Sequence, residues 1–214
     1  MKARYPLLFW RAALLLLSTG YAHASHAQAP REPPASVGRN IVSLSPAELF
    51  YKTQLGYERG VGPHSAVGLL GSYHYGVIEG YKGPQATVYY RYFVKRPFPT
   101  GLYFHCQLSL LHVEQTADLV NIKTKQYTEY RYQAVSMGGG IGLGYRRYLV
   151  RKATKSHLLV NALLGYRGNP RPQPDFDSSI YRLESSFLGP DFGWYLGFSP
   201  GSMAFGLLSL DYQF

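Results

Sequence analysis

Apolar and polar residues alternate with a period of two along most of the chain after residue 40. In residues 49–58, for example, Leu, Tyr and Thr side chains alternate with Phe, Lys, Gln and Gly. Successive side chains of a β-strand point to opposite faces, so this run predicts a strand with one apolar and one more polar face. Similar runs cover residues 41–45, 65–75, 85–93, 101–112, 134–147, 157–167, 188–198 and 204–214.

The composition agrees with an all-β protein. Of the 214 residues, 15% are aromatic and 23 are Gly, whereas only 16% are charged. A coiled coil would be rich in Ala, Glu, Lys and Leu, and a disordered chain would have few aromatic residues. The single cysteine, Cys106, excludes an intrachain disulfide and a cysteine-based zinc site.

The length and flanks of the runs favour an antiparallel transmembrane up-and-down β-barrel. A tilted strand crosses a bilayer in about 9–11 residues, and aromatic residues gather where it meets the interfaces. The polar faces hold mainly Gly, Ser, Gln and Tyr, which suits a crowded lumen better than an open surface. The alternative is a soluble exported barrel that keeps its apolar face inside and encloses a small apolar ligand.

The first 29 residues are predicted to be a signal peptide. Basic residues flank an apolar run over 7–17, and Ala27-Gln28-Ala29 forms a cleavage site; a site at Ala24 competes with it. The run is too short for a membrane-spanning helix. We expect a linker over 30–39 and an outer-membrane β-barrel domain over 40–214.

The predicted mature chain is basic. Beyond residue 29 it has 19 basic and 12 acidic residues, a formal charge of +7. Anionic outer-membrane lipid and lipopolysaccharide are the expected partners, while an exported chain without a recognition motif predicts no nucleic-acid binding. The last strand, which ends in Tyr212-Gln213-Phe214, predicts recognition by the barrel-assembly machinery.

The number of strands is ambiguous in the sequence. Long connections are expected at 76–83, 113–131 and 168–185, and short turns at 60–64, 95–100, 151–156 and 199–202. Nine runs do not fit the even number of strands in single-chain bacterial barrels. Either the first or the last run lies outside the barrel, or a strand lies within 168–185. Eight strands are favoured, and ten stay open.

Several short segments share a common character across residues 40–198: Asn40–Leu44, Leu55–Arg59, Tyr90–Tyr92, Gly101–Tyr103, the glycine run up to Gly144-Tyr145, and Gly189–Gly193. They resemble a family of uncharacterised small outer-membrane β-barrel proteins of Gram-negative bacteria, known as a domain of unknown function. The resemblance implies a location and a fold but no activity. This chain continues past Phe198, where similar chains tend to stop.

No residue pattern predicts catalysis, a metal or a cofactor. The glycine run 138–144 lacks both G-x-G-x-x-G spacing and a Walker lysine, and alternate glycines instead let a narrow barrel pack. His74 and His105 lack a third zinc ligand, so lumen hydrogen bonding is expected for them. His105 and Ser109 share a face but lie roughly 13 Å apart along a strand. A lipid-modifying enzyme is therefore the least favoured function.

Charged residues on the inward faces predict a structural network that fills the lumen. Unpaired charge in a narrow lumen is costly, and about eight strands leave space only for side chains. The external loops 113–131 and 168–185 are the candidate binding or adhesion surfaces of an otherwise monomeric, non-enzymatic protein. The predicted lumen network comprises Lys52, Glu58, Arg91, Arg146, Arg167, Asp191 and Asp211.

Overall fold

The structure is a computed structural model, which describes residues 39–76, 81–149, 157–172, 177–183, 194–195 and 201–214. The predicted signal peptide, almost all of the predicted linker and Asp191 lie outside these residues. No helix within the described residues has the length and apolar character to cross a membrane. The described elements are β1 (Asn40–Leu44), the 3₁₀ helix η2 (Pro46–Glu48), β2 (Lys52–Gly60), β3 (Ser65–Tyr75), β4 (Lys82–Phe93), β5 (Gly101–Asn121), β6 (Tyr127–Tyr148), β7 (Leu158–Gly168), β8 (Tyr181–Leu183) and β9 (Ala204–Gln213).

Eight of these strands form a closed antiparallel barrel. Neighbours along the chain pair from β1 to β7, β9 pairs with β7, and β1 pairs with β9 to close the ring. Backbone hydrogen bonds between Asn40 and Phe214 continue the β1–β9 ladder. The predicted all-β barrel of eight strands is therefore confirmed, with both the first and the last predicted run inside the ring.

The uncertainty about strand number came from residues 188–198, not from either end. Within that predicted strand, Trp194 and Tyr195 are helical, and the other residues lie outside those described. The connection 168–185 does contain a short strand, β8, but it pairs with residues 119–121 of β5, beyond the ring. The prediction of a strand through Trp194 was wrong.

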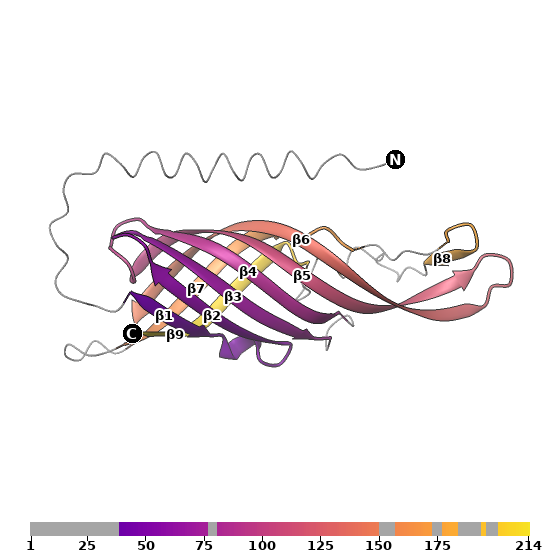
Figure 1. Ribbon diagram of the computed structural model, residues 1–214, viewed down its shortest axis with the longest axis horizontal. Helices are drawn as coiled ribbons and strands as arrows, with labels where there is room; N and C mark the ends of the chain where they lie inside the picture. The colour runs from indigo at the N-terminus through magenta and orange to yellow at the C-terminus, as the bar shows by residue number, and fades with distance from the viewer. Residues whose placement is uncertain (1–38, 77–80, 150–156, 173–176, 184–193, 196–200) are drawn as a thin grey trace. The chain divides into compact units, whose positions relative to one another are not determined.

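The longest departure from the expected loops is the hairpin of β5 and β6. Residues 113–131 were expected to form a connection, yet β5 and β6 pair continuously from Gly101 with Arg146 to Val120 with Tyr127. In Figure 1 the hairpin extends far beyond the ring, with β8 beside its tip. At the turn, the Asn121 side chain accepts hydrogen bonds from the backbone N–H groups of Lys123 and Thr124.

The start of β2 also differs from the prediction. Residues 49–51 were expected to belong to a strand, but Pro46–Glu48 form η2 and β2 begins at Lys52. Pro46 suits the start of η2, because proline lacks a backbone N–H and the first residues of a helix need no N–H for intrahelical hydrogen bonds. We call the end of the ring with η2 and the β5–β6 hairpin the hairpin end.

β1 is short, and this shapes one wall of the ring. It pairs with β2 from Leu55 to Arg59 and with β9 from Leu210 to Gln213. Toward the hairpin end, η2 lies against β9 and β2 where a longer β1 would have continued. Within the described residues, a 3₁₀ turn thus replaces a hydrogen-bonded strand in this part of the wall.

Candidate functional site: the polar interior of the barrel

The two faces of the strands have opposite chemistry, and the apolar face points outward. Ile141 and Leu164 expose 68% and 71% of their surface, although both lie in the middle of strands. Many outward aromatic side chains lie close to strand ends. Exposed apolar residues of the ring include Leu55, Val67, Leu69, Val88, Leu108, Leu110, Met137, Leu143 and Leu208, and exposed aromatic ones include Tyr57, Tyr73, Tyr75, Tyr90, Tyr92, Phe104, Tyr145 and Tyr212.

The inward face holds a fully buried charged cluster, which we call the central cluster: Glu58, Arg91, Arg146 and Asp211. Arg146 donates from both terminal nitrogens to Glu58, over 2.6 and 3.1 Å, and Arg91 donates to Glu58 over 2.6 Å. The Nε of Arg146 lies 2.8 Å from Oδ2 of Asp211. Two carboxylates thus balance two guanidinium groups in space where unpaired charge would be costly.

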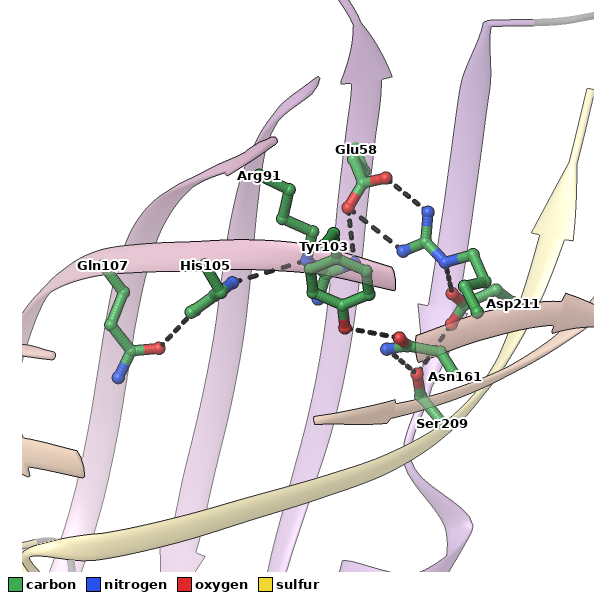
Figure 2. A network of polar contacts seen from close by, with 9 residues as sticks. Glu58, Arg91, Tyr103, His105, Gln107, Asn161, Ser209 and Asp211 are labelled. Atoms are coloured by element: carbon green, nitrogen blue, oxygen red, sulfur yellow. Dashed lines mark hydrogen bonds and ion pairs between the residues drawn. The ribbon is translucent and has the colours of Figure 1, made fainter. Parts of the chain in front are cut away.

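Neutral polar groups extend the central cluster on both sides (Figure 2). The Tyr103 hydroxyl donates to Asn161, which donates to Ser209, and Ser209 donates to Asp211 over 2.7 Å. The Arg91 guanidinium also lies over the Tyr103 ring, 4.8 Å from its centroid. Four strands, β4, β5, β7 and β9, are therefore joined through side chains as well as through backbone ladders.

His105 belongs to this network rather than to a catalytic pair. Its Nδ1 accepts a hydrogen bond from Nε of Arg91 at 3.4 Å, and its Nε2 lies 2.9 Å from the side-chain oxygen of Gln107. His74 makes a similar contact with Gln85 at 3.0 Å. Among the described residues, no group of three or more His, Cys, Asp or Glu side chains is arranged to hold a metal ion.

A second charged group, the mouth cluster, lies at the hairpin end: Glu48, Lys52 and Arg167. Lys52 Nζ is 3.2 Å from the Glu48 carboxylate, and both side chains are buried. Arg167 donates from Nε to the backbone oxygen of Ser202 over 2.9 Å. Burial and the nearby Glu48 carboxylate raise the pKa of Tyr51, which follows η2.

A cavity of about 200 Å³ separates the two clusters. Arg91 and His105 line one part of it, and all three members of the mouth cluster line another. The wall between them mixes polar side chains with apolar ones such as Leu70, Leu163 and Leu207. It includes Gln54, Ser72, Gln85, Thr87, Gln107 and Ser202, together with the rings of Tyr51, Tyr89 and Phe205.

Buried apolar side chains form two further clusters. One contains Phe93, Tyr103 and Leu163, with Phe98 from the β4–β5 connection packed against it. The other joins Trp194 to Tyr81, Leu111 and Val113. Trp194 is fully buried, and its indole N–H donates to the backbone oxygen of Asn169 over 2.8 Å.

Close packing explains two inward glycines of β6. A Cβ on Gly144 would lie 2.2 Å from the Tyr103 ring, and one on Gly138 would lie 1.6 Å from the Asn169 amide oxygen. Real Cβ atoms do not approach other atoms so closely. These glycines provide space for side chains of the network and form no nucleotide-binding loop.

Of the predicted lumen residues, four form the central cluster, and Lys52 and Arg167 lie in the mouth cluster. Asp191 lies outside the described residues. Glu48 was not predicted, because it lies in η2, just before the run 49–58 that indicated a strand. Tyr103 and Asn161 were on the inward faces, but only the folded ring shows that they join the central cluster.

No family model matches the chain, and no curated protein matches it. Among solved structures, the chain is similar to the N-terminal β-barrel domain of Pseudomonas aeruginosa OprF. The two share 14% sequence identity, with a TM-score of 0.41 over 83% of this chain and 98% of that one. The resemblance to a family of uncharacterised small barrels stays a prediction.

Proposed function

We propose that this chain is a small, monomeric, non-enzymatic outer-membrane β-barrel whose external segments carry whatever binding it performs. The observation that carries the proposal is the reversed arrangement of the closed ring. Side chains such as Leu55, Ile141 and Leu164 face outward, whereas the charges of the central cluster are buried. Exposing this apolar exterior to water would cost free energy, whereas contact with the hydrocarbon of a membrane would not.

The strand lengths support the same proposal. β2, β3, β4, β7 and β9 have 9, 11, 12, 11 and 10 residues. A tilted membrane strand needs about 9–11. Closure of the ring pairs the backbone of β1 with that of β9 along residues 210–213, and lipid favours such closed β-structures because they satisfy backbone hydrogen bonds. The predicted signal peptide, the expected contact with lipopolysaccharide and recognition of the last strand by the assembly machinery belong to this proposal.

The soluble alternative fits the interior less well. A soluble barrel for an apolar ligand needs an apolar cavity, but the buried charges of Lys52, Arg91 and Arg167 line the cavity here beside its apolar side chains. For the enzymatic alternative, His105 is engaged by Arg91 and Gln107. The two apolar clusters and the central cluster favour a lumen without a wide channel.

Fractionation with gel migration tests the membrane proposal. The full chain, expressed in a Gram-negative host, should appear in the outer-membrane fraction and require detergent for extraction. The extracted protein should migrate faster in SDS gels unheated than after boiling, since a folded barrel resists the detergent. Recovery of a folded, soluble protein without detergent would refute the proposal.

Orientation is tested separately with epitope tags. Barrels of this class expose their long loops outside the cell and their short turns in the periplasm. A tag inserted after Lys123, in the β5–β6 turn, should be detected on intact cells. The same tag inserted after Lys95, in the β4–β5 connection, should be detected only after the outer membrane is opened; the opposite result would reverse the orientation.

A further inference from the structure

The end of the ring opposite the hairpin end, which we call the turn end, has a basic sequence. Three connections meet there: β2 to β3, β4 to β5 and β6 to β7. The segments that contain them, residues 59–66, 93–101 and 146–157, have no Asp or Glu anywhere in their sequence. Their basic residues are Arg59, Lys95, Arg96, Arg146, Arg147, Arg151, Lys152 and Lys155.

The hairpin end differs, because its exposed charges have both signs. Asp118 and Glu129 lie on the two strands of the β5–β6 hairpin, and both are exposed. Lys123 and Lys125 are exposed in the turn between these strands. The basic character of the chain is therefore concentrated in the three connections of the turn end.

Basic side chains of the turn end lie on its surface. Arg59 and Arg147 are exposed and follow the buried Glu58 and Arg146, so they belong to the outward faces of β2 and β6. Backbone hydrogen bonds join the neighbouring segments: Gly60 donates to Arg39 over 2.7 Å, and Phe98 donates to Pro63 over 2.8 Å. Besides Arg59 and Arg147, the exposed basic residues here include Arg39, Lys95 and Arg96.

Outward tyrosines lie directly beside these basic residues. Tyr57 and Tyr145 expose 44% and 48% of their surface. Each lies two residues from an outward arginine, Arg59 or Arg147, which is about 7 Å along a strand. Membrane barrels carry aromatic residues where hydrocarbon meets the headgroups. If these tyrosines mark that boundary, the basic side chains are at the level of the headgroups.

We propose that the turn end binds anionic phospholipid headgroups of the surrounding leaflet, through Arg59, Lys95, Arg96 and Arg147. This inference rests on the proposed function, because it requires the ring to span a membrane. Ammonium and guanidinium groups donate hydrogen bonds to phosphate oxygens, and basic residues close to an anionic surface are attracted to it.

Two kinds of lipid in an outer membrane carry phosphate. Lipopolysaccharide occupies the leaflet that faces outside, and phospholipids form the leaflet that faces the periplasm. Short turns of such barrels face the periplasm. Phospholipid is therefore the proposed partner of the turn end, and lipopolysaccharide would instead meet the hairpin end.

Spin-labelled lipids test the proposal. The full chain is reconstituted into phosphatidylcholine vesicles at low ionic strength. It should immobilise spin-labelled phosphatidylglycerol several-fold more than spin-labelled phosphatidylcholine, and salt should reduce this preference. A ring that shows heat-modifiable migration but no preference would refute the lipid proposal alone. A chain without heat-modifiable migration would refute the proposed function as well.

A matched pair of double variants locates the effect. Lys95→Gln with Arg96→Gln removes two positive charges from the β4–β5 connection, and Lys123→Gln with Lys125→Gln removes two from the exposed β5–β6 turn. The first change should lower the preference for phosphatidylglycerol about twofold or more, and the second should leave it nearly unchanged. Equal losses in the two double variants would refute a site at the turn end.

The outward arginines separate charge from shape. Arg59→Gln with Arg147→Gln should lower the preference for phosphatidylglycerol, whereas Arg59→Lys with Arg147→Lys should keep most of it, because the positive charge remains. An equal loss in both pairs would contradict attraction by charge. Each variant must first show heat-modifiable migration, and Lys95→Gln with Arg96→Gln supplies the test at exposed connection residues if a strand variant does not fold.

Two further outcomes would assign the turn end to another partner. Detection on intact cells of the tag inserted after Lys95 would place this end outside the cell and refute binding to periplasmic phospholipid. Cosedimentation of the full chain with purified peptidoglycan is the other. If Lys95→Gln with Arg96→Gln abolished that cosedimentation and left the lipid preference unchanged, the surface would serve the cell wall, and the proposal would be wrong.

Discussion

The two charged clusters of the interior are built from the same residue types but in different surroundings. The central cluster is fully buried, balanced in charge and joined by short contacts from several strands. The mouth cluster adjoins the cavity, and its Lys52–Glu48 ion pair spans 3.2 Å. The difference predicts that loss of a carboxylate destabilises the barrel more in the first cluster than in the second.

Of the substitutions considered, Glu58→Gln should lower the free energy of unfolding most. The change leaves two buried guanidinium groups with Asp211 alone, and loss of one partner from a buried ion pair costs about 3–5 kcal/mol. The free energy of unfolding, from urea titration in detergent, should fall by that amount. Glu129→Gln, on the exposed hairpin, is the control and should behave like the wild type. A change below about 1 kcal/mol would contradict a structural role for the central cluster.

Gly144→Ala tests how much the stability of the barrel depends on close packing beside the central cluster. The added methyl group must displace the Tyr103 ring, which contacts both Arg91 and Asn161. Overpacking of this kind costs typically about 1–3 kcal/mol. Gly71→Ala is the matched control, because its Cβ would meet nothing closer than 4.0 Å. Equal stability of the two variants would show that the Tyr103 ring can move without lowering the free energy of unfolding.

Glu48→Gln should have a smaller effect on stability than Glu58→Gln. Lys52 loses its carboxylate partner, but the cavity lets water solvate the ammonium group. We expect a loss of about 1–3 kcal/mol, the usual cost of a buried polar group that loses its partner. The same urea titration measures it. A loss as large as that of Glu58→Gln would show that the two clusters do not differ.

Glu114→Gln, on the β5–β6 hairpin, should have the smallest effect. The Glu114–Arg131 pair spans 3.6 Å, and the Arg131 side chain is 72% exposed. Exposed pairs of this kind contribute about 0.2–1 kcal/mol and are weakened by salt. Urea titrations at low and high salt should give nearly the same stability as the wild type. A large loss would mean that the hairpin contributes to the stability of the ring.

The sequence predicted the ring well where one face of a strand meets the interior. The run 65–75 coincides with β3, because alternation persists wherever the two faces have different surroundings. Beyond the ring the hairpin has no such contrast. Residues 113–131 carry charges such as Glu114, Asp118 and Arg131 without a continuous apolar face, and they were therefore taken for a loop. Backbone pairing between β5 and β6 holds them extended.

Pairing within the interior was harder to predict than burial. Glu58 and Arg146 lie 88 residues apart, and only closure of the ring brings them together. At Trp194 the local pattern itself was misleading. Aromatic and glycine residues alternate around it as in a strand, but packing against Tyr81 and Leu111 takes precedence over the local pattern. Alternation identifies which side chains face inward, and the three-dimensional register decides their partners.

The short first strand affects both the folding of the newly made chain and the local stability of the folded barrel. β1 contributes five residues, and it joins segments separated by most of the chain. Until β9 has been synthesised, β1 has an open edge, and such edges invite aggregation. Contacts this distant in sequence also form slowly. In the finished protein this ladder is the shortest of the ring, so hydrogen exchange is expected to begin at β1.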